Sequence, residues 1–448
     1  MADQQPSLAT QVSDAVDRWI QEYHLVTRTD GDILYYYKEC GVYAPEGERL
    51  LAKLAEEEFH GKCTNNMVKE IIGMAKRRTY VEPEKFNVDP AIINVKNGLL
   101  NIWTRELIPH TPDVFYTVQL TVKYDLAARC PTIRKFFGEV IVPEDIPLLE
   151  EIPAWLLWRP YDIHKAIMLY GAGRNGKSAF LRLLEAFIGI ENVSHVSLPK
   201  LVGDRFAGID LVGKAGNFFG DLPAKDLSET EIFKAATGGD TIRVEDKFKK
   251  AYDYKNTTKM IFSANKLPKS PDDTDGFYSR WIIIKFPYQF GTEERPFNTN
   301  LDKELSTPEE LSGLLNLALE ALHRMKNKGW QFSYRMTLED VKDMYKRLSD
   351  PVYAFLQDCC EPAENAHIVK ADLYKDFQKY AVANRLPSMT MKKFVASTEE
   401  QSHIPVEPFR PQTDDGQKKA WMGIKMKDAD STDSTVSSYF TQKEKVIV

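Results

Sequence analysis

The chain has 448 residues, a length that predicts about three domains rather than one core. Hydrophobic residues make up 43% and charged residues 28%, as in ordinary soluble globular proteins. The net charge of −6 excludes a surface that is basic all over, but it allows a single basic face or channel for nucleic acid. No apolar run reaches the roughly 20 residues that span a bilayer, and the polar N-terminus is unlike a signal peptide. We therefore expect a cytoplasmic protein without a membrane partner. The five scattered cysteines predict reduced thiols rather than disulfides or a zinc site.

Residues 1–145 predict an N-terminal α+β domain. Residues 34–43 alternate like a small strand pair, a helical stretch follows from Arg49, and Asn97-Gly98 is typical of a tight turn between strands. We expect no metal-dependent primase site in this region. Its tyrosines are better explained as core and surface aromatics than as base-stacking platforms.

A phosphate-binding loop is the most specific motif of the sequence. Residues 165–170 form an apolar run fit for a buried parallel strand, residues 171–178 read G-x-x-x-x-G-K-S, and a helical pattern follows. In such a loop the backbone N–H groups surround the phosphates, while the lysine reaches the β- and γ-phosphates and the serine binds Mg²⁺. We therefore expect ATP and Mg²⁺ as cofactors, held by Gly171, Gly173, Arg174, Asn175, Gly176, Lys177 and Ser178.

The loop alone does not define what ATP hydrolysis drives, because kinases, GTPases, transporters and helicases share it. A small-molecule kinase needs an acceptor site and a lid, and the sequence shows neither. A GTPase usually carries an N-K-x-D motif. Asn265 and Lys266 begin such a motif, but the aspartate is missing, so GTP is disfavoured.

Three further polar residues stand at the ends of predicted strands. Asp221 follows the strand in 214–221 and would hold Mg²⁺ through water, although a surface aspartate in a turn is the alternative. Asn265 ends the strand in 259–265, where it would orient the attacking water and sense the γ-phosphate. Arg280 precedes a fourth strand and would reach the γ-phosphate of a neighbouring subunit, with a structural ion pair as the alternative.

A basic hairpin is predicted between residues 241 and 260, after a helix over 227–236. Six basic and three acidic residues give this segment a local charge excess of +3. Cations at the hairpin tip would contact phosphates and an aromatic ring would contact a base or sugar, and a solvated charged hairpin is the alternative. The predicted DNA contacts are Lys247, Phe248, Lys249 and Lys250.

Taken in chain order, five segments carry a family resemblance: GAGRNGKS, GDLP, FKAATGGD, IFSANKLP and GFYSRWIIIKFP. The ordered set, within a resemblance covering about 30–425, is similar to the superfamily 3 helicases, above all the primase-helicases of phages, plasmids and large DNA viruses. The resemblance implies a P-loop AAA+-like α/β motor over 146–335, preceded by a helicase-associated domain over 1–145. It also implies a ring, usually a hexamer, that translocates on single-stranded DNA and works with a separate primase.

The resemblance assigns Lys177 and Ser178 to the first motif, Asp221 to the second and Asn265 to the third, with Arg280 as the arginine finger. One position departs from the family pattern. Many relatives have two adjacent carboxylates in the second motif, whereas Asp221 is followed here by leucine and proline. Three residues therefore remain candidates for the catalytic base: Asp221, Glu229 and Glu231.

The C-terminal part predicts a winged-helix domain over 336–427. A helix over 308–328, with Thr307 and Glu310 as a capping box, precedes it. Helices over 368–383 and 388–397 and a hairpin around 414–416 then follow the winged-helix order. The charge excess of +4 over 370–393 favours a DNA-docking wing, with a plain packing module as the alternative.

The tail over 428–448 is polar and predicts disorder. Within it, Val436, Tyr439 and Phe440 have the spacing of the sliding-clamp-binding peptide of archaea and eukaryotes. Asp433 stands where that motif usually begins with glutamine. An isolated hydrophobic pair in a tail is the alternative.

The sequence as a whole predicts an ATP-dependent DNA helicase of replication, acting as a ring on single-stranded or forked DNA. An initiator or loader that melts or remodels DNA without processive unwinding is the first alternative. A nucleoprotein scaffold whose ATPase is only a switch is the second.

Overall fold

The computed structural model describes residues 6–28, 31–82, 85–223, 225–245, 251–384, 386, 388–401, 403–413 and 416–427. The chain forms two compact units. The first contains residues 1–222, 227–265 and 279–335, and the second contains 223–226, 266–278 and the chain from Met336 onward. Within the described residues, no helix is both long enough and apolar enough to cross a membrane.

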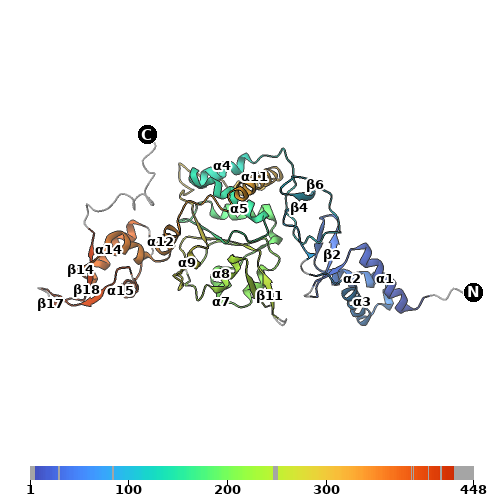
Figure 1. Cartoon of the computed structure of the whole chain (residues 1–448), viewed down its shortest axis with the longest axis horizontal. Coiled ribbons are helices and arrows are strands. Elements are labelled where there is room, and N and C mark those ends of the chain that lie inside the picture. Colours follow the sequence, from blue (N-terminus) through green and yellow to red (C-terminus); the bar gives the residue numbers. More distant parts are fainter. Residues whose placement is uncertain are drawn as a thin grey trace, which may run out of the picture. The chain divides into compact units, whose positions relative to one another are not determined.

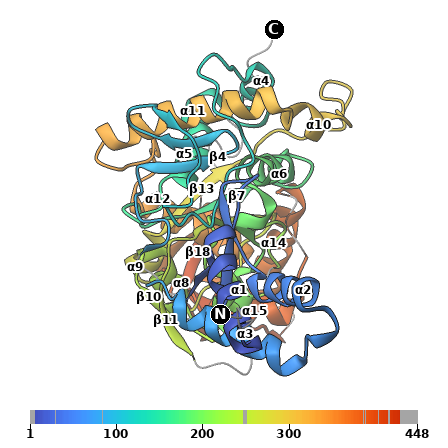
Figure 2. The ribbon, with the colours of Figure 1, turned by 90° about the vertical axis from the view of Figure 1, so that its right-hand side faces the viewer.

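The N-terminal helices build a small core of their own (Figure 2). Ser7 caps the first helix and Thr64 caps the third, each by accepting a backbone N–H with its hydroxyl. Val16, Leu51 and Ala75 pack together from the three helices, and the strand pair expected at 34–43 is present. The elements are α1 (Leu8–Glu22), β1 (Val26–Thr27), β2 (Ile33–Tyr37), β3 (Val42–Ala44), α2 (Gly47–Phe59), η1 (His60–Lys62) and α3 (Asn65–Arg78).

A three-stranded antiparallel sheet follows, and its side chains join the main core of the first unit. The tight turn predicted at Asn97-Gly98 is confirmed, because Val95 pairs with Gly98 across it. Val95 and Leu100 belong to the same apolar cluster as the central sheet. The elements are β4 (Ile92–Val95), β5 (Gly98–Asn101), β6 (Leu107–Ile108), α4 (Pro131–Val140), η3 (Pro143–Asp145) and α5 (Ile146–Leu157).

Five parallel strands form the central sheet of the first unit, in the order β13-β7-β12-β9-β8. All six residues of β12 are buried, as expected of a strand covered on both faces. Because the strands are parallel, their carboxyl ends meet at one edge, where the polar residues that follow them gather. The strands are β7 (Ala166–Tyr170), β8 (Val193–Ser194), β9 (Gly216–Phe219), β12 (Lys259–Ala264) and β13 (Trp281–Lys285).

Helices cover this sheet, with α4, α5 and α11 together on one side and α7, α8 and the β10–β11 hairpin on the other (Figure 1). The predicted helix over 227–236 begins later, at Glu231. The predicted basic hairpin is present, with Thr241 paired to Lys255 at its base. The elements are α6 (Lys177–Ile188), η4 (Ile190–Asn192), α7 (Leu198–Gly203), η5 (Ala207–Leu211), α8 (Glu231–Gly238), β10 (Thr241–Val244), β11 (Tyr252–Lys255), α10 (Leu301–Leu305) and α11 (Pro308–Asn327).

The capping box predicted at the start of α11 is wrong in one of its two halves. The Thr307 hydroxyl accepts the Glu310 N–H at 3.3 Å as expected. The Glu310 carboxylate instead accepts the backbone N–H groups of Thr132 and Ile133 at 3.1 and 3.0 Å, in the first turn of α4. Glu310 therefore caps a helix far away in sequence, because a buried carboxylate is stabilised by two unpaired donors at a helix amino terminus.

The second unit combines helices with an antiparallel sheet of order β14-β18-β15. The helix predicted over 368–383 begins only at Lys370, because residues 360–369 pair with β18. The helix predicted over 388–397 is shifted to 391–399, where Thr390 caps it. The predicted hairpin at 414–416 is formed by β16 and β17. The elements are α9 (Asp275–Tyr278), α12 (Leu338–Ser349), α13 (Pro351–Cys359), β14 (Cys360–Val369), α14 (Lys370–Ala383), α15 (Met391–Glu399), β15 (Glu407–Phe409), β16 (Gln412–Thr413), β17 (Gly416–Gln417) and β18 (Ala420–Met426).

Candidate functional site

The glycine-rich loop lies at the carboxyl end of β7, between that strand and α6. Its backbone takes left-handed conformations at Gly173, Arg174 and Gly176, with φ values of 102°, 53° and 90°. A β-carbon on Gly176 would meet a methyl group of Val140 at 2.5 Å, so glycine is required there by both conformation and space. No side chain caps the amino end of α6. The loop therefore presents a helix amino terminus with its first N–H groups open to an anion.

Lys177 is the centre of the site. Its side chain is buried, with the residue only 5% exposed, and its ammonium donates to the Gly171 carbonyl at 2.8 Å and to Asn265 Oδ1 at 3.0 Å. Burial lowers the pKa of Lys177, and the nearby negative charge of Asp221 opposes that shift. An ammonium has three N–H donors, so one remains for an anion beyond the two neutral oxygens.

The other loop residues frame this lysine. Asn175 is buried and donates its amide to the Tyr288 carbonyl at 2.7 Å, while its Oδ1 has no hydrogen-bond partner among the described residues. Ser178 is exposed at the second position of α6, where its hydroxyl can reach a metal ion. Arg174 is exposed, with its guanidinium 5.5 Å from the centre of the Phe297 ring.

Asp221 follows β9 and is held against β12. Its backbone has a φ of 51° and donates its N–H to the Ser263 hydroxyl at 3.2 Å, and its side chain is exposed. Of the three candidates for the catalytic base, Asp221 is the one whose charge acts on Lys177. Glu229 and Glu231 are exposed, and Glu231 is the first residue of α8.

Arg280 lies at the opposite edge of the sheet. Its carbonyl accepts the Ala166 N–H at 2.6 Å, at the amino ends of β7 and β13. The five-residue strands separate it from the loop by roughly 16 Å along their axes. Its buried Nε has no hydrogen-bond partner among the described residues. Lys177, Asp221 and Asn265 thus come together, whereas Arg280 does not join them within one chain.

The remaining predicted contacts fall outside the described residues. The hairpin tip with Lys247, Phe248, Lys249 and Lys250 lies there, as do Val436, Tyr439 and Phe440 of the tail. Within the described residues, no three histidine, cysteine, aspartate or glutamate side chains cluster in a way that could hold a metal ion.

Ser263 was missed by the sequence reasoning. It is fully buried within β12, its hydroxyl accepts the Asp221 N–H, and its carbonyl accepts the Leu222 N–H at 2.8 Å. These two bonds fix the turn that carries Asp221. A single hydroxyl inside the otherwise apolar run over 260–264 was the available signal.

Two family models match the chain over separate segments. The model described as "D5 N terminal like" matches residues 2–142, and the model described as "Family of unknown function (DUF5906)" matches residues 169–280. The second match begins within β7 and ends at Arg280, so it contains Lys177, Asp221 and Asn265.

Curated viral proteins are also similar. "Putative helicase L207/L206" of Acanthamoeba polyphaga mimivirus is 26% identical over 240 residues, covering 48% of this chain and 25% of that protein. "Putative helicase 121R" of Invertebrate iridescent virus 3 is 21% identical over 340 residues, covering 66% of this chain and 35% of that protein. The chain thus spans only a quarter to about a third of the length of these relatives.

Solved structures of the NrS-1 C-terminal region in its apo form are similar over 91% of this chain and 98% of theirs, at 10% and 11% identity and with TM-scores of 0.44 and 0.46. The structure itself is of the mixed α/β class, built on a parallel sheet. With its D5-like N-terminal segment and its helicase-named viral relatives, the chain is similar to the phage and viral primase-helicases.

Proposed function

We propose that the chain is the ATP-driven motor of a replicative DNA helicase. The hydrogen bond from the Lys177 ammonium to Asn265 is the observation that carries this proposal. This bond connects the phosphate-binding loop after β7 with the end of β12. A change in the phosphates bound by Lys177 would therefore alter the hydrogen bond to Asn265, the residue that follows β12. The viral relatives named as putative helicases support the same assignment.

The residues at the carboxyl edge fit ATP and Mg²⁺. Lys177 is buried beside neutral oxygens, the amino end of α6 is uncapped, and the loop glycines adopt the conformations that turn N–H groups inward. Lys177 would bind the β- and γ-phosphates, Ser178 would bind Mg²⁺ directly and Asp221 would bind it through water. Bound MgATP would supply the free energy of hydrolysis, and Asn265 would orient the attacking water.

Arg280 would complete the site of a neighbouring subunit in a ring, which we propose to be a hexamer. Arg280 does not join the carboxyl-edge site of its own chain, and its Nε at the other edge has no hydrogen-bond partner among the described residues. A finger supplied in this way stabilises the charge that develops in phosphoryl transfer.

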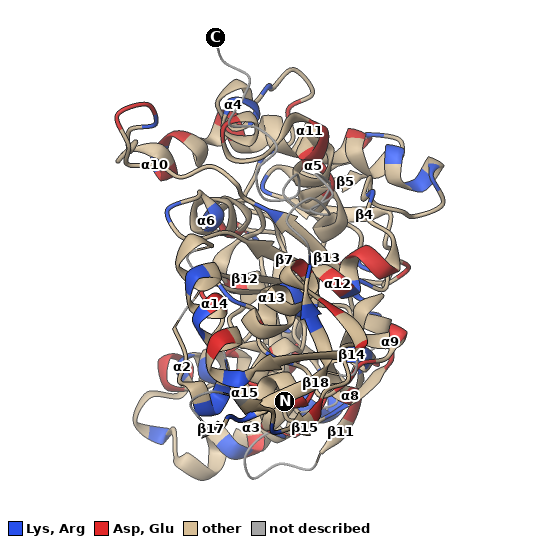
Figure 3. Cartoon of the chain, turned by 90° about the vertical axis from the view of Figure 1, so that its left-hand side faces the viewer, with Lys and Arg blue, Asp and Glu red and all other residues tan. Residues whose placement is uncertain are grey.

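Single-stranded or forked DNA would be the substrate, contacted by the tip of the β10–β11 hairpin. Ile242 and Val244 are buried and anchor the hairpin to the body of the motor, while Thr241 and Arg243 on the opposite face are exposed. In the second unit, Lys392 and Lys393 are exposed at the start of α15, and further lysines lie on α14 (Figure 3). We propose a winged-helix DNA contact there, a separate primase as partner, and sliding-clamp binding through Val436, Tyr439 and Phe440.

ATP hydrolysis and the unwinding of a forked DNA test this function, with Lys177→Ala and Arg280→Ala as variants. Arg49→Ala is the matched control, because Arg49 is exposed on α2 and its ion pair with Glu46 is on the surface. We expect wild type and Arg49→Ala to unwind and both site variants to fail. An equal mixture of the two site variants should recover part of the hydrolysis, because some mixed interfaces join an intact Lys177 to an intact Arg280.

Other results would point elsewhere. DNA-stimulated hydrolysis without strand displacement supports the initiator or loader. Hydrolysis that does not respond to DNA contradicts the helicase proposal and leaves a nucleotide switch. An equal mixture that stays inactive contradicts the shared site.

A further inference from the structure

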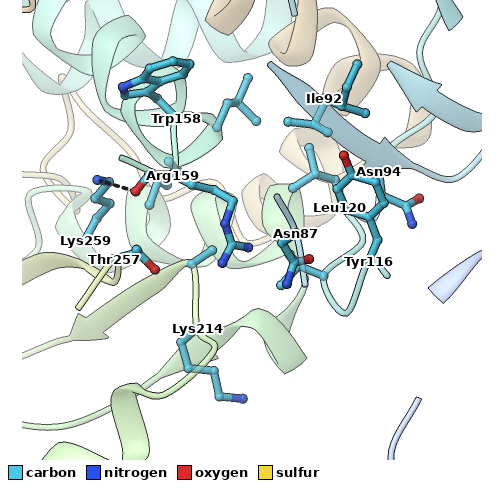
Figure 4. Close-up of a pocket in the computed structure, with 15 residues that line it drawn as sticks. Asn87, Ile92, Asn94, Tyr116, Leu120, Trp158, Arg159, Lys214, Thr257 and Lys259 are labelled. Carbon is cyan, nitrogen blue, oxygen red and sulfur yellow. Dashed lines mark hydrogen bonds between the residues drawn. The ribbon is translucent and has the colours of Figure 1, made fainter. Parts of the chain in front are cut away.

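A pocket at the amino edge of the central sheet contains a cation that none of the described residues neutralises. It is lined by residues from the β4 region, the end of α5 and the segments that lead into β9 and β12 (Figure 4). Lys259, the first residue of β12, lines this pocket at the amino end of the strand. Asn265 of the candidate ATP site lies at the opposite end, directly after the last residue of β12. The pocket is therefore a different place from the phosphate-binding loop.

Arg159 points into this pocket, with its guanidinium between Asn87 and Thr257 (Figure 4). It lies just beyond the carboxyl end of α5 and is partly buried. Within the part of the chain that the structure describes, its guanidinium forms no ion pair and no hydrogen bond. Burial lowers the pKa of Arg159, and the titratable groups that oppose this shift are the phenols of Tyr254 and Tyr116 rather than a carboxylate. An uncompensated guanidinium in a partly apolar pocket is unfavourable unless an anion joins it.

Most other polar groups of the pocket already have partners. The Lys259 ammonium donates to the Pro160 carbonyl at 2.7 Å, and the Lys214 ammonium donates to the Glu191 carbonyl at 2.6 Å. The Asn87 amide exchanges hydrogen bonds with Thr117. The nearby Asp162 carboxylate accepts the Trp158 indole N–H at 2.5 Å.

The Arg159 guanidinium and the Thr257 hydroxyl are the two groups left to bind a ligand, and together they are complementary to a phosphate group. A guanidinium offers two parallel N–H donors, and the Thr257 hydroxyl, which has no partner in the described residues, offers a third. Lys259 and Lys214 also line the pocket. Donors in this fork arrangement match the oxygens of a phosphate group.

We propose that the Arg159 pocket binds a phosphate group, carried either by a nucleic-acid strand or by a free nucleotide. Thr257 lies two residues beyond β11, so a ligand in the pocket sits at the base of the β10–β11 hairpin. If the hairpin contacts DNA, the phosphate in the pocket belongs to the DNA strand, and this version of the inference rests on the proposed function. A free nucleotide does not depend on it.

Binding measurements on the full chain with Arg159→Met test the proposal, because methionine keeps much of the side-chain length and removes the charge. Arg159→Lys is the conservative variant, and Arg49→Met is the matched control on α2. The probes are a fluorescent single-stranded oligonucleotide, the same oligonucleotide with neutral methylphosphonate linkages, and AMP. AMP is titrated in the Lys177→Ala background, so that the loop after β7 does not contribute. Thermal unfolding checks that each variant is folded.

If the phosphate belongs to a nucleic-acid strand, Arg159→Met should weaken oligonucleotide binding about tenfold. It should also reduce the salt dependence of that binding by about one phosphate contact. Arg159→Lys should keep part of the affinity, Arg49→Met all of it, and neutral linkages should abolish the difference between wild type and Arg159→Met. If instead only AMP binding is lost, the phosphate comes from a free nucleotide, and the proposal stands even where the chain binds no DNA. Unchanged affinity and salt dependence for every probe in folded Arg159→Met overturn the proposal, whether or not the chain is a helicase.

Discussion

Replacing Asn265 by aspartate tests how the candidate ATP site works. Asn265 Oδ1 lies 3.0 Å from the Lys177 ammonium, so Asn265→Asp converts a neutral hydrogen bond into an ion pair. At that distance a pair of unit charges attracts by about 1.4 kcal/mol in water and about 5.5 kcal/mol at an effective dielectric constant of 20. Asn265 is exposed, so the lower figure applies, and it corresponds to about tenfold in an equilibrium constant.

The new carboxylate would compete with the phosphates for Lys177. We expect Asn265→Asp to weaken ATP binding by about tenfold or more, measured by titration with a fluorescent ATP analogue. Asn265→Ala removes the acceptor without adding charge, so its binding should change by less than about threefold, while turnover falls by about ten- to a hundredfold if Asn265 orients the attacking water.

Asn384→Asp, at an exposed position of the second unit, is the control for the added charge and should behave as wild type. The reasoning is refuted if Asn265→Asp binds ATP as tightly as wild type. It is also refuted if Asn265→Ala retains full turnover, because the amide would then have no part in the reaction.

Three further predictions concern conformation and stability. Gly176→Ala should abolish ATP binding, because its new methyl group would meet Val140 at 2.5 Å and its φ is 90°. Gly138→Ala, whose β-carbon meets nothing within 4 Å, is the control. Intact ATP binding by Gly176→Ala would contradict the requirement for glycine in the loop. Glu310→Ala should lower the free energy of unfolding by about 3 kcal/mol in urea, because two N–H groups of α4 lose their acceptor, whereas a loss below about 1 kcal/mol would mean that water replaces it. Burial holds the pKa of Lys259 well below its usual value of about 10.4, so the unfolded chain binds the extra proton between the two pKa values and stability rises with pH there. Lys259→Met should remove this slope, which is at most about 1.36 kcal/mol per pH unit, and equal pH profiles for the two proteins would contradict the shift.

Local sequence determined the elements that carry the site. The strand–loop–helix around Lys177 follows from an apolar run, two glycines in positive φ and an amphipathic helix, all within 25 residues. The hairpins at Asn97-Gly98 and at 241–255 follow from turn residues and alternation in the same way. These signals are local because the backbone conformation and the burial pattern of a short element depend mostly on its own residues.

Boundaries that depend on a distant partner were less predictable. Residue Ile368 has a helical pattern, but pairing with Trp421 makes it part of a strand. Glu310 has the spacing of a capping box, but the amino end of α4 offers two unpaired donors and takes its carboxylate. The division at residue 145 stays a prediction, and one apolar cluster includes residues on both sides of it.

The candidate site also combines features that the sequence predicts with features that only the tertiary structure shows. The order of motifs was enough to select Lys177, Asp221 and Asn265, because residues after parallel strands share one edge of the sheet. Only the tertiary structure decided that Asn265 bonds to Lys177, that Ser263 holds Asp221, and that Arg159 remains without a counter-charge. These relations join residues up to 88 positions apart, and a distance of that kind is fixed by the packing of strands and helices rather than by any local pattern.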